Sequence, residues 1–265
     1  MVSLISICTE KSWKIRFFRE FLTPLRFLRI PRVKLNVKFV NKKIPLVLPL
    51  KYIEHALLNL EHVLIDCDYF QVENAIPSLG SSVLDIGGFL GFYTVASSLL
   101  AGKNGIVHVF EPNPLVLPYL ARNTEIASSI GARVYVYPRA LCAERGQTNL
   151  YIGENPAVSS TRREHVETFT TITCSLPVMC VKLSSVLRYF GYIDVVKIDV
   201  EGLEVELLRE AGCELRRVKN LVIEVHRDLV ETSEVEKILL NHGFTHTLIY
   251  TSSEIPRQVV LYAWK

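Results

Sequence analysis

The stretch Ser82-Val-Leu-Asp-Ile-Gly-Gly-Phe-Leu-Gly-Phe-Tyr93 decides the fold of this chain. A short apolar run ends at Asp85, and a turn containing Gly87, Gly88 and Gly91 follows before helix-forming residues begin. This is the pattern of a buried parallel strand that turns tightly into a helix beside a nucleotide-like ligand. The stretch therefore predicts the first strand and helix of a Rossmann-like sheet.

The spacing of the glycines indicates which ligand the turn suits. A dinucleotide fingerprint that began at Gly87 would need glycine at two positions where this chain has Phe89 and Phe92. S-adenosylmethionine has no phosphate, and a carboxylate such as Asp85 suits its positive charges. The next apolar run ends at Glu111, whose carboxylate can accept hydrogen bonds from both ribose hydroxyls of an adenosine. These details favour S-adenosylmethionine over a dinucleotide.

The charge of the chain is divided unevenly along its length. The 265 residues can form one large domain, with or without an appendage. Residues 1–43 carry a balance of +9, whereas the remainder carries −6. We therefore divide the chain into a basic, apolar N-terminal arm (1–50) and a catalytic domain (51–265). A core with a negative balance also disfavours nucleic acid as a partner.

The arm allows two interpretations. It is either a helix packed on the domain with its cations in solvent, or a peripheral contact with an anionic membrane surface. We predict neither a signal peptide nor a membrane anchor, and therefore a cytoplasmic protein, with the inner membrane face as a further site of association. The six cysteines show no metal-binding spacing, which favours free thiols in a reducing compartment. Cys174 and Cys180 would be a candidate pair under oxidising conditions.

Strands and helices alternate along the domain, which predicts a parallel sheet with right-handed crossovers. Helices are expected at 51–64, 69–76, 91–101, 114–127, 184–190, 203–211 and 231–241, with strands at 82–86, 106–110, 133–137, 193–199, 220–226, 245–250 and 258–264. The last two strands are expected to form a closing antiparallel pair. Residues 142–182 break the alternation and predict inserted hairpins, with short strands at 148–152, 168–174 and 178–183. Tyr151, Arg162, Arg163 and His165 of this insertion are expected to be solvent-exposed loop residues, with contact to a polar acceptor as the alternative.

Acidic residues recur where the strands end. Ligands of such sheets bind outside the carboxyl ends of the strands, and Asp85, Glu111, Asp199 and Glu224 are all at such ends. Asp199 and Glu201 are two residues apart and would face the same way in extended backbone. A carboxylate there could orient a sulfonium, hold an acceptor hydroxyl or act as general base. The alternative is an acidic first turn that only stabilises the following helix.

At these residues the chain resembles the FkbM-like family of S-adenosylmethionine-dependent methyltransferases. The matching pieces are Asp85-Ile-Gly-Gly-Phe-Leu-Gly91, Phe110-Glu-Pro112, Leu120-x-x-Asn123, Ala140-Leu141, Ser159-Ser160, Lys197-Ile-Asp-Val-Glu-Gly-Leu-Glu204 and Ile223-Glu-Val-His226. The resemblance implies an α/β, Rossmann-like class I methyltransferase fold, with a seven-stranded, mostly parallel sheet, a closing antiparallel strand and a β-hairpin insertion. It also implies methylation of a hydroxyl on a sugar, glycolipid or natural product.

The resemblance and the strand ends together yield two sets of candidate residues. The expected cofactor-binding residues are Asp85, Gly87, Gly88, Phe89, Gly91, Phe92, Tyr93, Glu111, Pro112, Asn113, Ala140, Leu141 and Ser160. The expected catalytic residues are Asp199, Glu201, Lys197, His226 and Glu224. Among the latter, we expect Asp199, with His226 or Lys197 nearby, to deprotonate or polarise the acceptor hydroxyl.

Several alternatives remain open at this point. A divalent cation held by Asp199, Glu201 and Glu224 is compatible with the sequence, which does not settle metal dependence. An NAD-dependent oxidoreductase would share the architecture, and an inactive nucleoside-binding module would share the ligand. Two departures from the family pattern, Phe89 where Asn is frequent and Ser184 where Asp is frequent, suggest an atypical member. The acceptor, small molecule or glycan, is not identified by the sequence.

Overall fold

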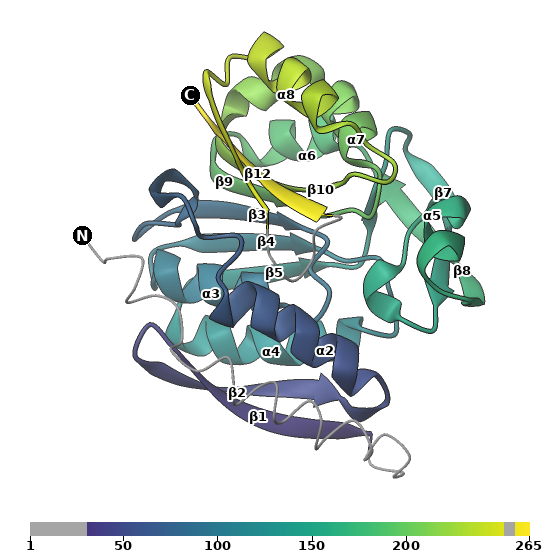
Figure 1. Ribbon diagram of the computed structural model, residues 1–265. Helices are drawn as coiled ribbons and strands as arrows, with labels where there is room; N and C mark the ends of the chain where they lie inside the picture. The colour runs from purple at the N-terminus through teal and green to yellow at the C-terminus, as the bar shows by residue number, and fades with distance from the viewer. Residues whose placement is uncertain (1–30, 252–257) are drawn as a thin grey trace.

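A twisted seven-stranded sheet forms the centre of the computed structural model, which describes residues 31–251 and 258–265 (Figure 1). Its strands in spatial order are β11 (His246–Tyr250), β12 (Gln258–Trp264), β10 (Val218–His226), β9 (Ile193–Ile198), β3 (Ser82–Ile86), β4 (Ile106–Phe110) and β5 (Arg133–Tyr137). β12 is antiparallel to both of its neighbours, and the other adjacent pairs are parallel. The predicted fold class, including the closing antiparallel pair, is confirmed.

Helices cover both faces of this sheet. In Figure 1, α2, α3 and α4 lie on one side and α6, α7 and α8 on the other. The helices are α2 (Ile53–Leu60), α3 (Phe92–Ala101), α4 (Leu117–Ile130), α5 (Arg163–Phe169), α6 (Leu183–Phe190), α7 (Glu204–Ala211) and α8 (Thr232–Asn241). Successive residues of a strand face opposite layers, so Val83 and Val195 pack into one apolar cluster, and Leu84 and Val196 into the other. Burial on both faces explains why these strands are almost entirely apolar.

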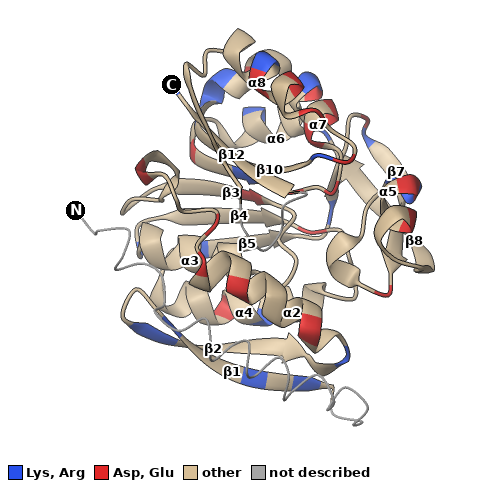
Figure 2. Cartoon of the chain, in the orientation of Figure 1, with Lys and Arg blue, Asp and Glu red and all other residues tan. Residues whose placement is uncertain are grey.

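Residues 32–49 form a hairpin, which the sequence analysis had placed in the basic arm. β1 (Arg32–Phe39) pairs with β2 (Lys42–Pro49) through a two-residue turn at Val40 and Asn41, both with positive φ. The hairpin packs on α4, where the buried Asn123 side chain accepts a hydrogen bond from Val47 N and donates to Val47 O. Its exposed lysines and arginine give the edge of the molecule a basic strip in Figure 2. The predictions for the arm before Pro31 concern residues outside the described range.

The sequence predicts a second regular helix at 69–76, but the segment between α2 and β3 does not form one. α2 passes into a π-helical turn at Glu61–Ile65, and an irregular segment with one 3₁₀ turn at Glu73–Ala75 leads to β3. This segment places Tyr69 and Phe70 in the core, where the Phe70 ring stacks on Tyr93. Burial of these aromatic rings outweighs the helical propensity of their neighbours.

The insertion is a small sheet with one helix beside it. β6 (Ala140–Leu141), β8 (Ile172–Val181) and β7 (Gly146–Gly153) lie in that order, and β7 pairs antiparallel with β8. The two short strands expected after residue 167 are instead the end of α5 and one long strand.

The cysteines of this insertion differ from expectation. Cys142 and Cys180 form a disulfide, so the prediction of free thiols is wrong for this pair. Cys180 does not pair with Cys174, whose thiol is free. The correct partner precedes the loop that leads into β7, and the pairing of β6 with β8 brings the two sulfurs together.

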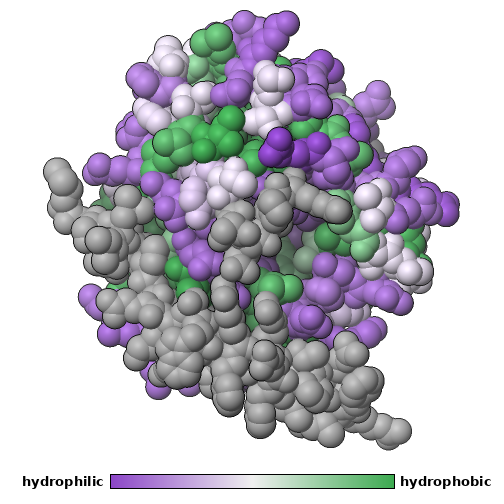
Figure 3. All heavy atoms as spheres, in the orientation of Figure 1, coloured by the Kyte–Doolittle hydropathy of each residue, from purple (hydrophilic) through white to green (hydrophobic). Residues whose placement is uncertain are grey.

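None of the helices within residues 31–251 and 258–265 is long and apolar enough to cross a membrane. The described part of the face in Figure 3 shows hydrophilic and hydrophobic residues interspersed.

Candidate active site

The carboxyl ends of β3, β4 and β9 open into a pocket that the insertion covers from one side. The pocket contains about 620 Å³ of space, which includes the part that is open to solvent. It is lined by Ile86, Gly87, Phe89, Phe110, Glu111, Pro112, Arg139, Ala140, Leu141, Leu150, Pro156, Ala157, Ser159, Ser160, Thr161, Asp199, Val200, Glu201 and Leu203. The sheet supplies one wall and the insertion the other. Residues as far apart in the sequence as Ile86 and Leu203 therefore line one cavity.

The turn after β3 requires glycine for steric reasons. Gly87 has a φ of 83°, and a Cβ added there would lie 1.8 Å from the backbone oxygen of Asp199. A Cβ at Gly88 would lie 2.3 Å from a methyl group of Val109. The backbone of the turn therefore approaches two neighbouring segments more closely than a side chain would allow.

Glu111 connects this turn to the loop after β4. Its Oε2 accepts a hydrogen bond from Phe89 N at 2.7 Å, and its Oε1 accepts one from Asn113 N at 2.8 Å. Burial raises the pKa of Glu111 to about 7, although both hydrogen bonds oppose the shift. The carboxylate also lines the pocket, and each of its oxygens can accept a further hydrogen bond there.

Lys197 ties the ends of β3 and β9 together. Its Nζ donates to Gly87 O at 2.6 Å and lies 3.4 Å from Asp85 Oδ1 and 3.3 Å from Asp199 Oδ2. Burial alone would lower the pKa of Lys197, but the charges of Asp199 and Asp85 raise it well above its ordinary value. Lys197 is therefore a fixed cation beneath the pocket rather than a proton acceptor.

Asp199 reaches the pocket wall, whereas Glu224 lies behind it. Burial, opposed by the charge of Lys197, raises the pKa of Asp199 to about 7. Glu224 accepts hydrogen bonds from the Tyr69 hydroxyl and, at 3.3 Å, from His62 Nε2. Burial opposes ionisation of Glu224, but the hydrogen bond and charge of His62 lower its pKa. Glu224 is thus an ionised, already partnered carboxylate.

Two residues in this second layer escaped the sequence analysis. His62 Nδ1 pairs with Asp68 Oδ2 at 2.6 Å, and Tyr69 links Glu224 to Asp199. Burial lowers the pKa of His62, but its two carboxylate partners raise it to about 10. His62 belongs to the π-helical turn after α2 and Tyr69 to the irregular segment before β3, and the sequence carries no motif that marks either of them.

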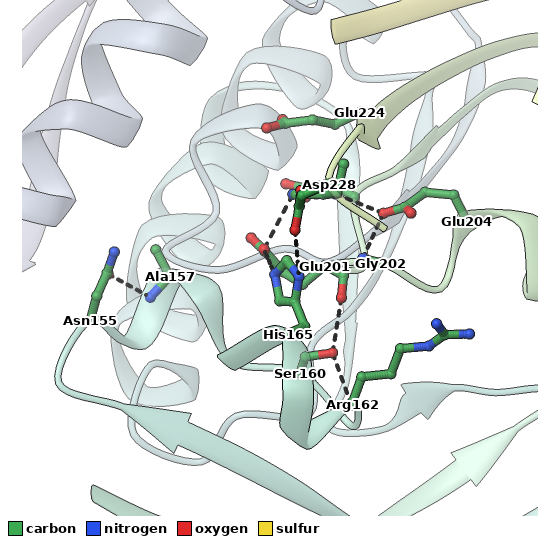
Figure 4. A network of polar contacts seen from close by, with 12 residues as sticks. Asn155, Ala157, Ser160, Arg162, His165, Glu201, Gly202, Glu204, Glu224 and Asp228 are labelled. Atoms are coloured by element: carbon green, nitrogen blue, oxygen red, sulfur yellow. Dashed lines mark hydrogen bonds and ion pairs between the residues drawn. The ribbon is translucent and has the colours of Figure 1, made fainter. Parts of the chain in front are cut away.

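Beyond Asp199 a second cluster of polar groups is drawn in Figure 4. His226 Nδ1 lies 2.8 Å from Glu204 Oε1, and its Nε2 lies 3.2 Å from Glu201 Oε2. His165 Nε2 contacts the same oxygen at 2.7 Å. His165 is fully buried, so the expectation that it is an exposed loop residue is wrong. α5 carries it inward, against the loop that follows β9.

The structure sorts the predicted residues into two layers. Those that line the pocket are Gly87, Phe89, Glu111, Pro112, Ala140, Leu141, Ser160, Asp199 and Glu201. Those that support it from behind are Asp85, Gly88, Gly91, Phe92, Tyr93, Asn113, Lys197, Glu224 and His226. Asp85, for example, is fully buried and accepts a hydrogen bond from Thr94 Oγ1. Phe92 and Tyr93 lie in the core because they begin the buried face of α3.

Both the sequence and the fold of this chain can be compared with those of known proteins. No curated protein matches the sequence significantly. Among solved structures, the fold is similar to magnesium protoporphyrin IX methyltransferase from Synechocystis PCC 6803 with bound SAM, at 15% identity and a TM-score of 0.47 over 97% of this chain and 99% of that chain. A precorrin-6y C5,15-methyltransferase from Geobacter metallireducens GS-15 is similar at 15% identity and a TM-score of 0.42, over 80% and 86% of the two chains.

The family comparison is more informative. The model of the methyltransferase FkbM domain matches residues 85–245, which is more than half of the chain. The match begins at the aspartate of the glycine turn and extends past β10, so it contains every predicted site residue. The chain therefore belongs to the FkbM methyltransferase family, with S-adenosylmethionine as its cofactor.

Proposed function

We propose that this protein transfers a methyl group from S-adenosylmethionine to a hydroxyl oxygen of a small-molecule or glycan acceptor. The observation that carries the proposal is the position of Asp199. Its carboxylate lines the pocket beside the glycine turn and is held from behind by Lys197 and Tyr69. A fixed carboxylate at this point is suited to accept the proton of a hydroxyl group.

The pocket residues fit the cofactor. Glu111 keeps acceptor capacity for ribose hydroxyls after it has bonded two backbone N–H groups. The glycine turn brings bare backbone to the pocket wall, and Leu141 and Phe110 offer apolar surface to an adenine ring. When bound, S-adenosylmethionine supplies an electrophilic methyl group.

The protein's own residues then have separable tasks. Asp199 accepts the hydroxyl proton, Lys197 keeps that carboxylate in place, and Glu111 fixes the nucleoside. Holding two reactants in a reactive geometry contributes roughly 7–11 kcal/mol to catalysis. The negative balance of the core supports a small or glycan acceptor over nucleic acid. A cytoplasmic location and membrane contact through the arm stay predictions.

The test is transfer of isotope-labelled methyl groups to a panel of sugars, glycolipids and polyketide alcohols, with amines and carboxylic acids as comparison acceptors. We expect label only in hydroxyl compounds, in a product that resists mild alkali as an ether does and a methyl ester does not. Asp199→Asn should lower turnover by about 10²–10⁴ without weakening binding of S-adenosylhomocysteine. Glu125→Gln, a surface carboxylate on α4, should leave turnover unchanged. Label confined to amines or carboxylic acids would refute the proposal.

A further inference from the structure

Three side chains from distant parts of the chain present donor atoms to one point. His165 belongs to α5 of the insertion, Glu201 to the loop after β9, and His226 to the end of β10. One donor atom from each lies within 4.8 Å of the other two. Both imidazoles direct Nε2 at the same carboxylate oxygen, Glu201 Oε2, at 2.7 Å from His165 and 3.2 Å from His226.

Acidic groups stand behind both imidazoles. Glu204 Oε1 lies 2.8 Å from His226 Nδ1, and neither side chain is exposed to solvent. Glu204 Oε1 also accepts a hydrogen bond from Gly202 N. Behind His165, Asp228 Oδ2 lies 3.8 Å from Nδ1. A carboxylate that is hydrogen-bonded to the far nitrogen of a histidine fixes its tautomer and makes the near nitrogen a better ligand, as Glu204 does for His226. Asp228 lies beyond hydrogen-bonding distance of His165 and acts on it only through its charge.

This arrangement places the electron pairs of several ligand atoms around one buried point. With Nδ1 of His226 protonated toward Glu204, the lone pair of Nε2 points at the lone pairs of Glu201. Across the described ranges, His226 Nε2 is a fully buried nitrogen without a hydrogen-bond partner, since its contact with Glu201 lacks hydrogen-bond geometry. Electron pairs that converge in a buried space need a positive charge between them, which either a second proton on His226 or a bound cation can supply.

We propose that His165, Glu201 and His226 form a binding site for a divalent transition-metal ion of the Zn²⁺ class. Ligand atoms bound at 2.0–2.2 Å to one ion stand roughly 3.0–3.5 Å apart, close to the two measured N–O separations. Two imidazoles and one carboxylate suit zinc-like ions, whereas Mg²⁺ and Ca²⁺ favour sites made of oxygen alone. This differs from the all-carboxylate site that the sequence allowed.

A second donor group, Asp199, Glu224 and His226, shares one histidine with this site. Its carboxylates already have partners, because Lys197 lies beside Asp199, and Tyr69 donates to Glu224. An ion there would have to displace those contacts, so the site with two histidines is favoured.

The loop that carries Glu201 is prepared for this role. Glu201 has a φ of 54°, in the left-handed region that non-glycine residues rarely adopt. Ser160 holds the loop by donating its hydroxyl to Glu201 O at 3.0 Å. Glu201 also lines the pocket, as Asp199 does, so an ion bound to the Glu201 carboxylate would lie beside the pocket. A role for that ion in holding the acceptor oxygen rests on the proposed function, whereas ion binding does not.

The test measures ion binding to the full chain after treatment with a chelator. Calorimetry and metal analysis should show one equivalent of Zn²⁺, which excess Mg²⁺ does not displace. His165→Ala, Glu201→Gln and His226→Ala should each abolish stoichiometric binding, and Glu204→Gln should weaken it by about 10–100-fold. Replacing His242, which follows α8, and His246, which lies on β11, should change nothing because both are away from the site. Asp199→Asn should leave the affinity within a few-fold.

A second measurement keeps the test independent of the folding of the variants. Co²⁺ added to the unsubstituted protein should give visible absorption typical of imidazole and carboxylate ligation, and Zn²⁺ should remove it. Absence of stoichiometric Zn²⁺ binding would overturn the proposal. Binding that survives in folded His226→Ala and Glu201→Gln, or that depends on His242 and His246, would overturn it as well. Because neither measurement uses methyl transfer, failure here leaves the proposed function intact.

Discussion

The hydroxyl of Tyr69 lies 3.3 Å from Oδ2 of Asp199 and donates a hydrogen bond to Glu224 behind it. Burial and the charge of Asp199 raise the pKa of this phenol well above 10, so Tyr69 stays a donor at any working pH. The tyrosine therefore keeps two carboxylates of like charge in place on adjacent strand ends.

Removal of this hydroxyl should impair turnover more than binding. Tyr69→Phe deprives Glu224 of a charge-assisted hydrogen bond, a type of contact with a net value of about 1.5–3 kcal/mol. We expect kcat to fall by about 10–100-fold, with little change in the affinity for S-adenosylhomocysteine. Steady-state kinetics and calorimetry would check this, with the exposed Tyr189→Phe as control. Equal losses in both variants would contradict the role given to Tyr69.

Binding of the cofactor should depend on pH through Glu111. Its pKa of about 7 lies above the ordinary value of 4.5, so the carboxyl of the free protein is protonated at lower pH. A protonated carboxyl loses acceptor capacity toward ribose hydroxyls, so affinity should rise as pH increases toward 7 and level off above it. Calorimetry with S-adenosylhomocysteine between pH 6 and 8 measures this. Glu111→Gln should bind more weakly at pH 8 and lose the dependence; the same pH profile in both proteins would rule Glu111 out as its source.

Two glycines with nearly equal φ separate strain from steric conflict. Gly87 and Gly80 have φ of 83° and 86°, but within the described structure a Cβ at Gly80 meets no atom within 4 Å. Gly80→Ala should cost only the backbone strain, about 1–2 kcal/mol. Gly87→Ala must in addition displace the strand end at Asp199, so it should lose cofactor binding as well as stability. Urea denaturation and a thermal-shift titration would distinguish them, and similar behaviour of the two variants would argue against close approach at Gly87.

The hairpin should depend on one side chain of α4. Asn123 is fully buried and bonds Val47 N, Val47 O and Leu90 O, so Asn123→Ala would leave buried backbone groups without partners. Each such group costs about 1–3 kcal/mol, and we expect a loss of about 2–5 kcal/mol in the free energy of unfolding. Chemical denaturation measures the loss. The exposed Asn149→Ala should change stability by less than about 0.5 kcal/mol, and a comparable loss in that variant would contradict the assignment.

The parts of the fold that the sequence predicted well are those with local signals. The strands at 82–86, 106–110 and 133–137 were placed at their observed bounds, because apolar runs bounded by turn residues mark buried strands. The placement of Asp85, Asp199 and Glu224 at one edge of the sheet followed from topology, since parallel strands end at one edge. Glu111 followed from the same reasoning.

What the sequence did not reveal depends on contacts between distant segments. Tyr69 contacts Asp199 across 130 residues of chain, and His165 contacts Glu201 across 36, so neither belongs to a local pattern. The hairpin did carry a signal, because Val33, Leu35 and Val37 alternate with polar residues. The excess of positive charge in that region predicts a basic arm instead. Side chains that act from behind the pocket wall, such as Asp85, also look the same in sequence as those that line it.

The disulfide between Cys142 and Cys180 has a consequence for the pocket wall beside it. It closes a loop with a sequence separation of 38 residues, which lowers the entropy of the unfolded chain and stabilises the fold by about 3–4 kcal/mol in the chain-entropy model. The two residues before Cys142 form β6 and belong to the cavity surface. A strand of only two residues is thus anchored by a covalent crosslink as well as by its pairing with β8, and a thiol reductant acting on the insertion would loosen the surface proposed to contact the nucleoside.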